Sequence, residues 1–270
     1  MATTRLSLVA FAGLVAASIA AFFVTQHLKV TTPLIAGGAG APRPVPGVIN
    51  PLHPVQCGAY NTGSTTISFY LQHRSDDVIV SVVNPADDAV VRTVANGRHM
   101  RKNVRIPDGV FHWNGRLADG QVAPDGSYYF RVTLIHQNRT IDLTDVPVKV
   151  NTTAPHPVIT SVQPTDIAPG SRVTIHYAGN ENRGGTILLY RLDTAHGRAR
   201  MIKQFLTPWK GHTAIWDGTV AQQQPAPPGR YLLALQVSDA ACNTGRYPVR
   251  IPPPAGSAAG SDADPVVTVR

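Results

Sequence analysis

The chain has 270 residues, enough for one large domain or two of ordinary size, and a net charge of +8. Only 15% of the residues are charged, whereas Gly and Pro contribute 23 residues each, a composition typical of short strands joined by tight turns. The sequence lacks the clustered Lys/Arg and aromatic residues of a nucleic-acid platform, so no nucleic-acid partner is expected. Two cysteines are too few for a disulfide scaffold.

Residues 1–29 are predicted to form a membrane segment. After Arg5, the stretch "LSLVAFAGLVAASIAAFFV" (6–24) carries no charge and approaches the ~20 residues that a transmembrane helix needs. It ends on bulky residues that do not suit cleavage, although Ser18-Ile19-Ala20 is a passable cleavage triplet. The expected localisation is therefore a single-pass cell-membrane protein with its bulk extracytoplasmic, and secretion after signal cleavage is the alternative. Residues 30–51, rich in Pro and Gly, are expected to be a linker.

Residues 52–153 contain several segments with the period-two alternation of half-buried strands. The expected strands are residues 65–71, 77–85, 89–94, 126–136 and 140–150. A second block, residues 154–252, repeats the order with expected strands at 172–179, 185–193, 199–205, 229–239 and 244–252. Residues 253–270 are of low complexity and are expected to be a disordered tail.

The two blocks share a spaced motif that repeats at one constant offset of 103 residues. Its members are Trp113, Gly115, Gly126 and Tyr128 in the first block and Trp216, Gly218, Gly229 and Tyr231 in the second. A repeat of about a hundred residues has the size of an immunoglobulin-like (Ig-like) sandwich. We expect each Trp to bury its ring, the following Gly to take positive φ in a turn, and each Tyr to bury a ring with a polar tip.

The segment "WDGTVAQQQPAPPGRY" resembles the W-D-G, polar loop, G-x-Y signature of the Ig-like domain in flagellar hook-capping proteins (the FlgD Ig-like family). The first copy has Asn114 in place of the usual Asp, and the "VSDAACNTG" ending has Cys242 where Gly is common. The resemblance covers both blocks and implies two tandem Ig-like β-sandwiches in an extracytoplasmic setting, but no reaction. A true hook cap is not expected, because those proteins lack a hydrophobic anchor and have an additional hook-binding region.

No catalytic, metal or cofactor site is predicted. The chain has a single glutamate, Glu181, and no histidine pair at metal-ligand spacing. Cys57 precedes the strands of the first block, whereas Cys242 lies in a late loop of the second. In an end-to-end tandem these positions would be too far apart to bond, so free thiols or an intermolecular disulfide are expected.

Two features point to anionic partners. Residues 154–252 hold ten basic and five acidic residues, although a soluble domain from an Arg-rich proteome would look the same. The segment "NGRHMRKNVR" supplies a candidate contact for anionic surfaces, against the alternative of a solvated loop; its basic residues are Arg98, Arg101, Lys102 and Arg105.

The sequence thus predicts an all-β, non-catalytic protein with a structural, adhesive or scaffolding role in the cell envelope. Its expected partners are the membrane, through the N-terminal helix, and an anionic wall polymer or another envelope protein. The alternatives are a wall-polymer- or carbohydrate-binding module and an accessory subunit that positions an envelope enzyme.

Overall fold

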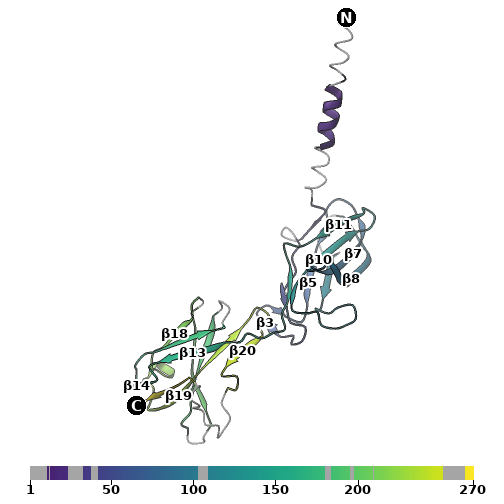
Figure 1. Ribbon diagram of the computed structural model, residues 1–270. Helices are drawn as coiled ribbons and strands as arrows, with labels where there is room; N and C mark the ends of the chain where they lie inside the picture. Colours follow the sequence, from purple (N-terminus) through teal and green to yellow (C-terminus); the bar gives the residue numbers. More distant parts are fainter. Residues whose placement is uncertain are drawn as a thin grey trace.

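The computed structural model describes residues 11, 13–23, 33–37, 42–102, 109–179, 184–194, 198–208, 210–251 and 265–270. Beyond a short N-terminal helical segment, these residues form two β-sandwiches arranged end to end (Figure 1), with one 3₁₀ turn, η1 (Ala221–Gln223). The prediction of an all-β, sandwich-type fold is confirmed.

The predicted membrane anchor is wrong. The helical residues that the structure describes fall within 11–23. Across the described part of the chain, no helix combines the length and the apolar character required to cross a bilayer. The expected single-pass localisation is therefore overturned.

The larger sheet of sandwich 1 has the strand order β2-β12-β10-β7-β8, and β11 pairs with β10 beyond the end of β12. Its strands are β2 (Val48–Ile49), β7 (Asp76–Asn84), β8 (Ala89–Met100), β10 (Gly126–Leu134), β11 (Arg139–Asp142) and β12 (Val148–Val150). The opposing layer consists of two short pairs: β1 (Ile35–Ala36) with β6 (Tyr70–Leu71), and β5 (Thr65–Ser68) with β9 (Val110–Trp113).

The core of sandwich 1 lies between these layers because alternate residues of each strand point inward. Val78, Val80 and Val82 of β7 are each 0% exposed and pack with Phe130 of β10. Burying such side chains contributes roughly 1.5–3 kcal/mol each, which stabilises the sheet pairing.

Sandwich 2 repeats this arrangement around a second core. Its larger sheet has the order β14-β21-β19-β16-β17 with β20 on β19, and its smaller sheet has the order β13-β15-β18. The strands are β13 (Val158–Gln163), β14 (Asp166–Ile167), β15 (Val173–Ala178), β16 (Gly185–Arg191), β17 (Arg200–Leu206), β18 (Thr213–Trp216), β19 (Gly229–Ser238), β20 (Thr244–Tyr247) and β21 (Val266–Val269).

Two predicted boundaries differ from the structure. Residues assigned to a free linker are part of sandwich 1, since β1 pairs with β6 and β2 pairs with β12. These residues dock because Ile35 and Ile49 are apolar enough to enter the core, where they are 6% and 0% exposed. The supposed disordered tail contains β21, which pairs with both β19 and β14 and completes the larger sheet of sandwich 2.

Candidate functional site: the junction between the sandwiches

The repeated motif forms the same aromatic corner in both sandwiches. The Trp113 ring lies 5.2 Å from the Tyr128 ring, and the Trp216 ring lies 5.6 Å from the Tyr231 ring. Each indole N–H donates to a carbonyl three residues on, and each tyrosine hydroxyl donates to a proline carbonyl four residues back.

The glycines of the motif allow the chain to turn beside these rings. Gly115 and Gly218 both have φ +69, and Gly229 has φ +151, in the region that favours glycine. A side chain at Gly218 would run into the Ser171 carbonyl oxygen. Gly126 has no such strain and begins β10. The motif residues are structural in both copies.

Three of the four predicted anion-contact residues lie at the end of β8, on the end of sandwich 1 away from sandwich 2. Arg98, Arg101 and Lys102 are exposed, and Arg105 lies outside the described residues. The guanidinium of Arg98 lies over the Phe111 ring, 5.3 Å from its centroid, and makes a cation–π contact with sandwich 1.

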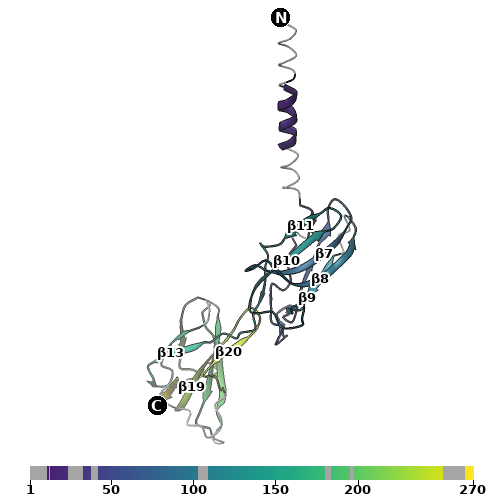
Figure 2. The ribbon, with the colours of Figure 1, turned by 45° about the vertical axis from the view of Figure 1, so that its right-hand side comes forward.

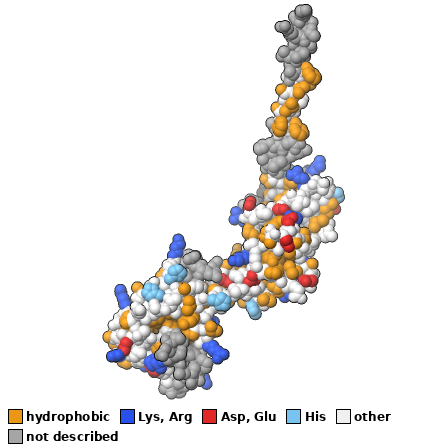
Figure 3. Space-filling view, in the orientation of Figure 1, with side chains coloured by type: hydrophobic (Ala, Val, Ile, Leu, Met, Phe, Trp, Pro, Cys, Tyr) orange, Lys and Arg blue, Asp and Glu red, His pale blue; other side chains and the backbone are white. Residues whose placement is uncertain are grey.

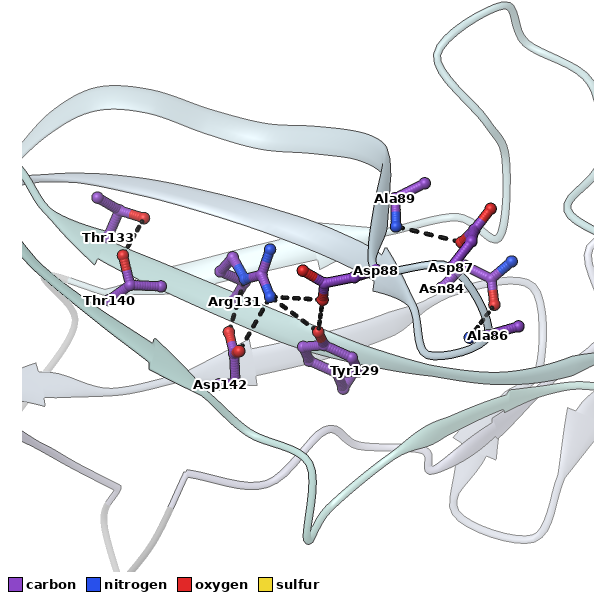
Figure 4. A network of polar contacts seen from close by, with 10 residues as sticks. All are labelled: Asn84, Ala86, Asp87, Asp88, Ala89, Tyr129, Arg131, Thr133, Thr140 and Asp142. Atoms are coloured by element: carbon purple, nitrogen blue, oxygen red, sulfur yellow. Dashed lines mark hydrogen bonds and ion pairs between the residues drawn. The ribbon is translucent and has the colours of Figure 1, made fainter.

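A polar network crosses the outer face of the larger sheet of sandwich 1 (Figure 4). The Arg131 guanidinium donates to both oxygens of Asp142, at 2.7 and 2.9 Å, and to Asp88 at 2.7 Å. The Tyr129 hydroxyl donates to Asp88 at 2.6 Å, which lowers the pKa of Asp88 and raises that of Tyr129 to about 12. A general acid needs a protonated carboxyl near neutral pH. This network instead holds Asp88 ionised and braces neighbouring strands.

The junction of the two sandwiches is built around a hairpin that sequence reasoning missed. Between β2 and β5, sandwich 1 carries residues 50–64, which form β3 (Gln56–Cys57) and β4 (Tyr60–Asn61). Sandwich 2 has only residues 168–172 between β14 and β15. Figures 1 and 2 show the hairpin lying between the sandwiches, beside the turn that leads into β20.

A disulfide joins this hairpin to sandwich 2. Cys57 of β3 bonds to Cys242, which lies in the turn between β19 and β20, across a sequence separation of 185 residues. The expectation of free thiols or an intermolecular bond is therefore wrong. The inserted hairpin reaches past the end of its own sandwich, so the two Cα atoms lie 5.8 Å apart.

Buried amide and carboxylate side chains reinforce the disulfide. Asn50, Asp239 and Asn243 are 0%, 8% and 9% exposed, and burying such groups is costly unless each finds a partner. The Asn50 side-chain nitrogen donates to the side-chain oxygen of Asn243, and the Asn243 side-chain nitrogen donates to the Asn151 backbone carbonyl at 2.9 Å. Asn151 also donates to Asp239 at 2.9 Å. We call Asn50, Asn151, Asp239 and Asn243 the amide clasp.

The Asp239 carboxylate also shapes the turn that presents Cys242. One of its oxygens accepts the backbone N–H groups of Ala241 at 2.8 Å and Asn243 at 3.0 Å. Cys242 takes φ +59 inside this turn. The connecting segment packs closely as well, because a side chain at Gly245 would run into the Pro155 carbonyl oxygen. The junction is thus covalently and sterically fixed.

Besides the junction, metal-ligand groups and surface grooves are the other kinds of candidate site. Among the described residues, no group of three or more His, Cys, Asp or Glu side chains could hold a metal ion. An open groove of about 840 Å³ runs along β13 and β15 of sandwich 2. Its lining residues are Val162, Gln163, Pro164, Thr165, Asp166, Thr174 and His176.

No family model and no curated protein matches the chain. Among solved structures, the FN1–FN3 domains of chicken CNTN1 are 13% identical with a TM-score of 0.36; the match covers 77% of this chain and 63% of that one, less than two thirds. The human OSCAR ligand-binding domain is 15% identical with a TM-score of 0.33, and the match covers 76% of this chain and 93% of that one. Native E. coli alpha-2-macroglobulin is 10% identical with a TM-score of 0.29, and the match covers 86% of this chain and 14% of that one. Likenesses this distant carry no argument about function.

Proposed function

We propose that the chain is a non-catalytic binding or scaffolding protein that presents two Ig-like sandwiches as one locked pair outside the reducing cytosol. The observation that carries this proposal is the Cys57–Cys242 bond between the sandwiches. Disulfides form and persist in oxidising compartments, so a junction that depends on one suits a secreted or envelope protein. The hydrophobic stretch at residues 6–24 is then proposed as a secretion signal, and the FlgD-type Ig-like resemblance is proposed as its family relationship.

A locked pair suits binding because it lowers the entropic cost of engaging a partner with both modules at once. Two sandwiches joined by a flexible linker would have to be ordered on each binding event. In this chain the amide clasp and the disulfide set their relative placement in advance.

The test is co-sedimentation of the intact, oxidised chain with purified cell envelope across a salt titration. The matched control is Cys57→Ser/Cys242→Ser/Asn243→Ala, which removes both the disulfide and the amide clasp and leaves every surface charge in place. We expect the oxidised chain to be retained and the unlocked variant to be retained several-fold less. If neither protein is retained at any salt concentration, the binding role fails and only a spacer role survives.

A further inference from the structure

Three arginines gather at the end of sandwich 2 farthest from the junction. Arg191, the last residue of β16, stands directly opposite Arg200, the first residue of β17. Arg198 lies two residues before Arg200 and is exposed, as is Arg200. Like charges directly opposite each other in antiparallel strands destabilise the pairing. We call Arg191, Arg198 and Arg200 the arginine tip.

Arg191 is incompletely satisfied within the sandwich. One terminal nitrogen donates to the Pro228 carbonyl at 3.1 Å, but its Nε is buried and has no hydrogen-bond partner among the described residues. Burying a donor of a charged group without a hydrogen-bond partner lowers the stability of the fold, and such donors are rare in native proteins. Because this Nε is closed to solvent, a ligand would contact the exposed Arg198 and Arg200, and Arg191 would add positive charge behind them.

The arginine tip keeps an excess of positive charge. Among the described residues, the ion pairs of sandwich 2 are Lys203 with Asp217 and Arg270 with Asp166, and neither includes a member of the tip. The Asp193 carboxylate lies beside Arg191, since a side chain at Gly229 would meet one of its oxygens at 3.2 Å and the Arg191 Nε at 3.5 Å, and it accepts the backbone N–H of Arg230. One carboxylate beside three guanidinium groups leaves the tip positive. Figure 3 shows Lys and Arg side chains standing out from sandwich 2, with few Asp or Glu side chains among them.

We propose that the arginine tip binds a phosphodiester polymer, an inference that rests on the proposed binding role and names the class of its ligand. The guanidinium fork matches phosphate oxygens in geometry and keeps its charge at any physiological pH. An exposed ion pair contributes little by itself, so a single phosphate would bind weakly, whereas a polymer with regularly repeated phosphates engages several arginines together. Tyr190, the aromatic residue next to Arg191, is 8% exposed and offers no open ring face on which a base could stack, which favours a polymer without bases.

The experiment measures binding of the full, oxidised chain to immobilised poly(glycerol phosphate) as the salt concentration rises. The tip variant is Arg198→Gln/Arg200→Gln. The matched control is Arg98→Gln/Lys102→Gln, which removes the same charge from the predicted cluster at the opposite end of the molecule. We expect the tip variant to lose about tenfold or more in affinity and to flatten the dependence of log K on log salt by about two, while the control keeps both.

A stability measurement separates a ligand site from a structural role. Because Arg200→Gln removes the opposition to Arg191, it should raise the melting temperature slightly while weakening the polymer's binding. A fall in melting temperature would show that Arg200 supports the fold and would overturn the inference. So would equal binding by the tip variant and the wild type, or tighter binding to the carboxylate polymer hyaluronan. If the chain is retained by cell envelope but ignores poly(glycerol phosphate), this inference fails and the proposed function stands; if it does neither, both fail.

Discussion

At the scale of single residues, two buried tyrosines of sandwich 2 have opposite hydrogen-bonding states. The Tyr231 hydroxyl donates to the Pro227 carbonyl at 2.6 Å, whereas the Tyr177 hydroxyl is buried without a partner in the described structure. Tyr231→Phe should therefore lower the free energy of unfolding by about 1 kcal/mol. Tyr177→Phe removes an unsatisfied group and should leave the free energy of unfolding unchanged or raise it.

Urea denaturation of both variants, followed by the fluorescence of the buried tryptophans, measures the difference. Tyr128→Phe in sandwich 1 is the matched control, since its hydroxyl makes the corresponding bond to the Pro124 carbonyl at 2.9 Å. Equal losses at Tyr177 and Tyr231 would mean that the Tyr177 hydroxyl has a partner after all.

The aromatic corner could be predicted because its Trp, Gly and Tyr residues lie close together in the sequence of each copy. Spacing fixes which ring meets which turn, and the two copies at one offset reinforce each other. The disulfide could not be predicted in this way, because Cys57 and Cys242 have no shared pattern and meet only through the geometry of the junction. The signal that could have pointed to it is the length of one connection, because residues 50–64 of sandwich 1 are longer than the corresponding residues 168–172 of sandwich 2.

At the scale of elements, the last strand of sandwich 2 lies where the repeat did not place it. The repeated strand order put the counterpart of residues 140–150 at residues 244–252, yet Val249 is 84% exposed and β21 forms the last strand instead. The offset holds to the start of β19 and is lost after it, above all because more residues separate β20 from β21 than separate β11 from β12. A low-complexity composition hid a short, strongly apolar strand.

A matched pair of substitutions tests this assignment. Val267 of β21 is 0% exposed, so Val267→Thr buries a hydroxyl and should cost about 1–3 kcal/mol of stability. Val249→Thr exchanges the same groups in solvent and should change stability by less than about 0.5 kcal/mol. Thermal unfolding of the two variants gives the comparison, and a larger loss at Val249 would return the strand to residues 244–252.

At the scale of the whole molecule, each sandwich has its own core, and the junction decides how the two move relative to each other. The disulfide and the amide clasp act on the same degree of freedom, so their contributions should not add. With the disulfide intact, Asn243→Ala should leave the spread of distances between the sandwiches nearly unchanged. In the Cys57→Ser/Cys242→Ser background, the same substitution should broaden it, because no other lock remains.

Small-angle scattering of the four proteins in this cycle measures the effect, and the fluorescence of Trp113 and Trp216 checks that both cores stay folded. The wild type and each singly unlocked protein should fit one compact arrangement, while the doubly unlocked protein should require a range of arrangements. If the disulfide-free chain already samples that full range with Asn243 present, the clasp holds nothing and the covalent bond alone orients the pair. In that case reduction would release the sandwiches completely, and any binding that needs both of them would depend on the redox state of the surroundings.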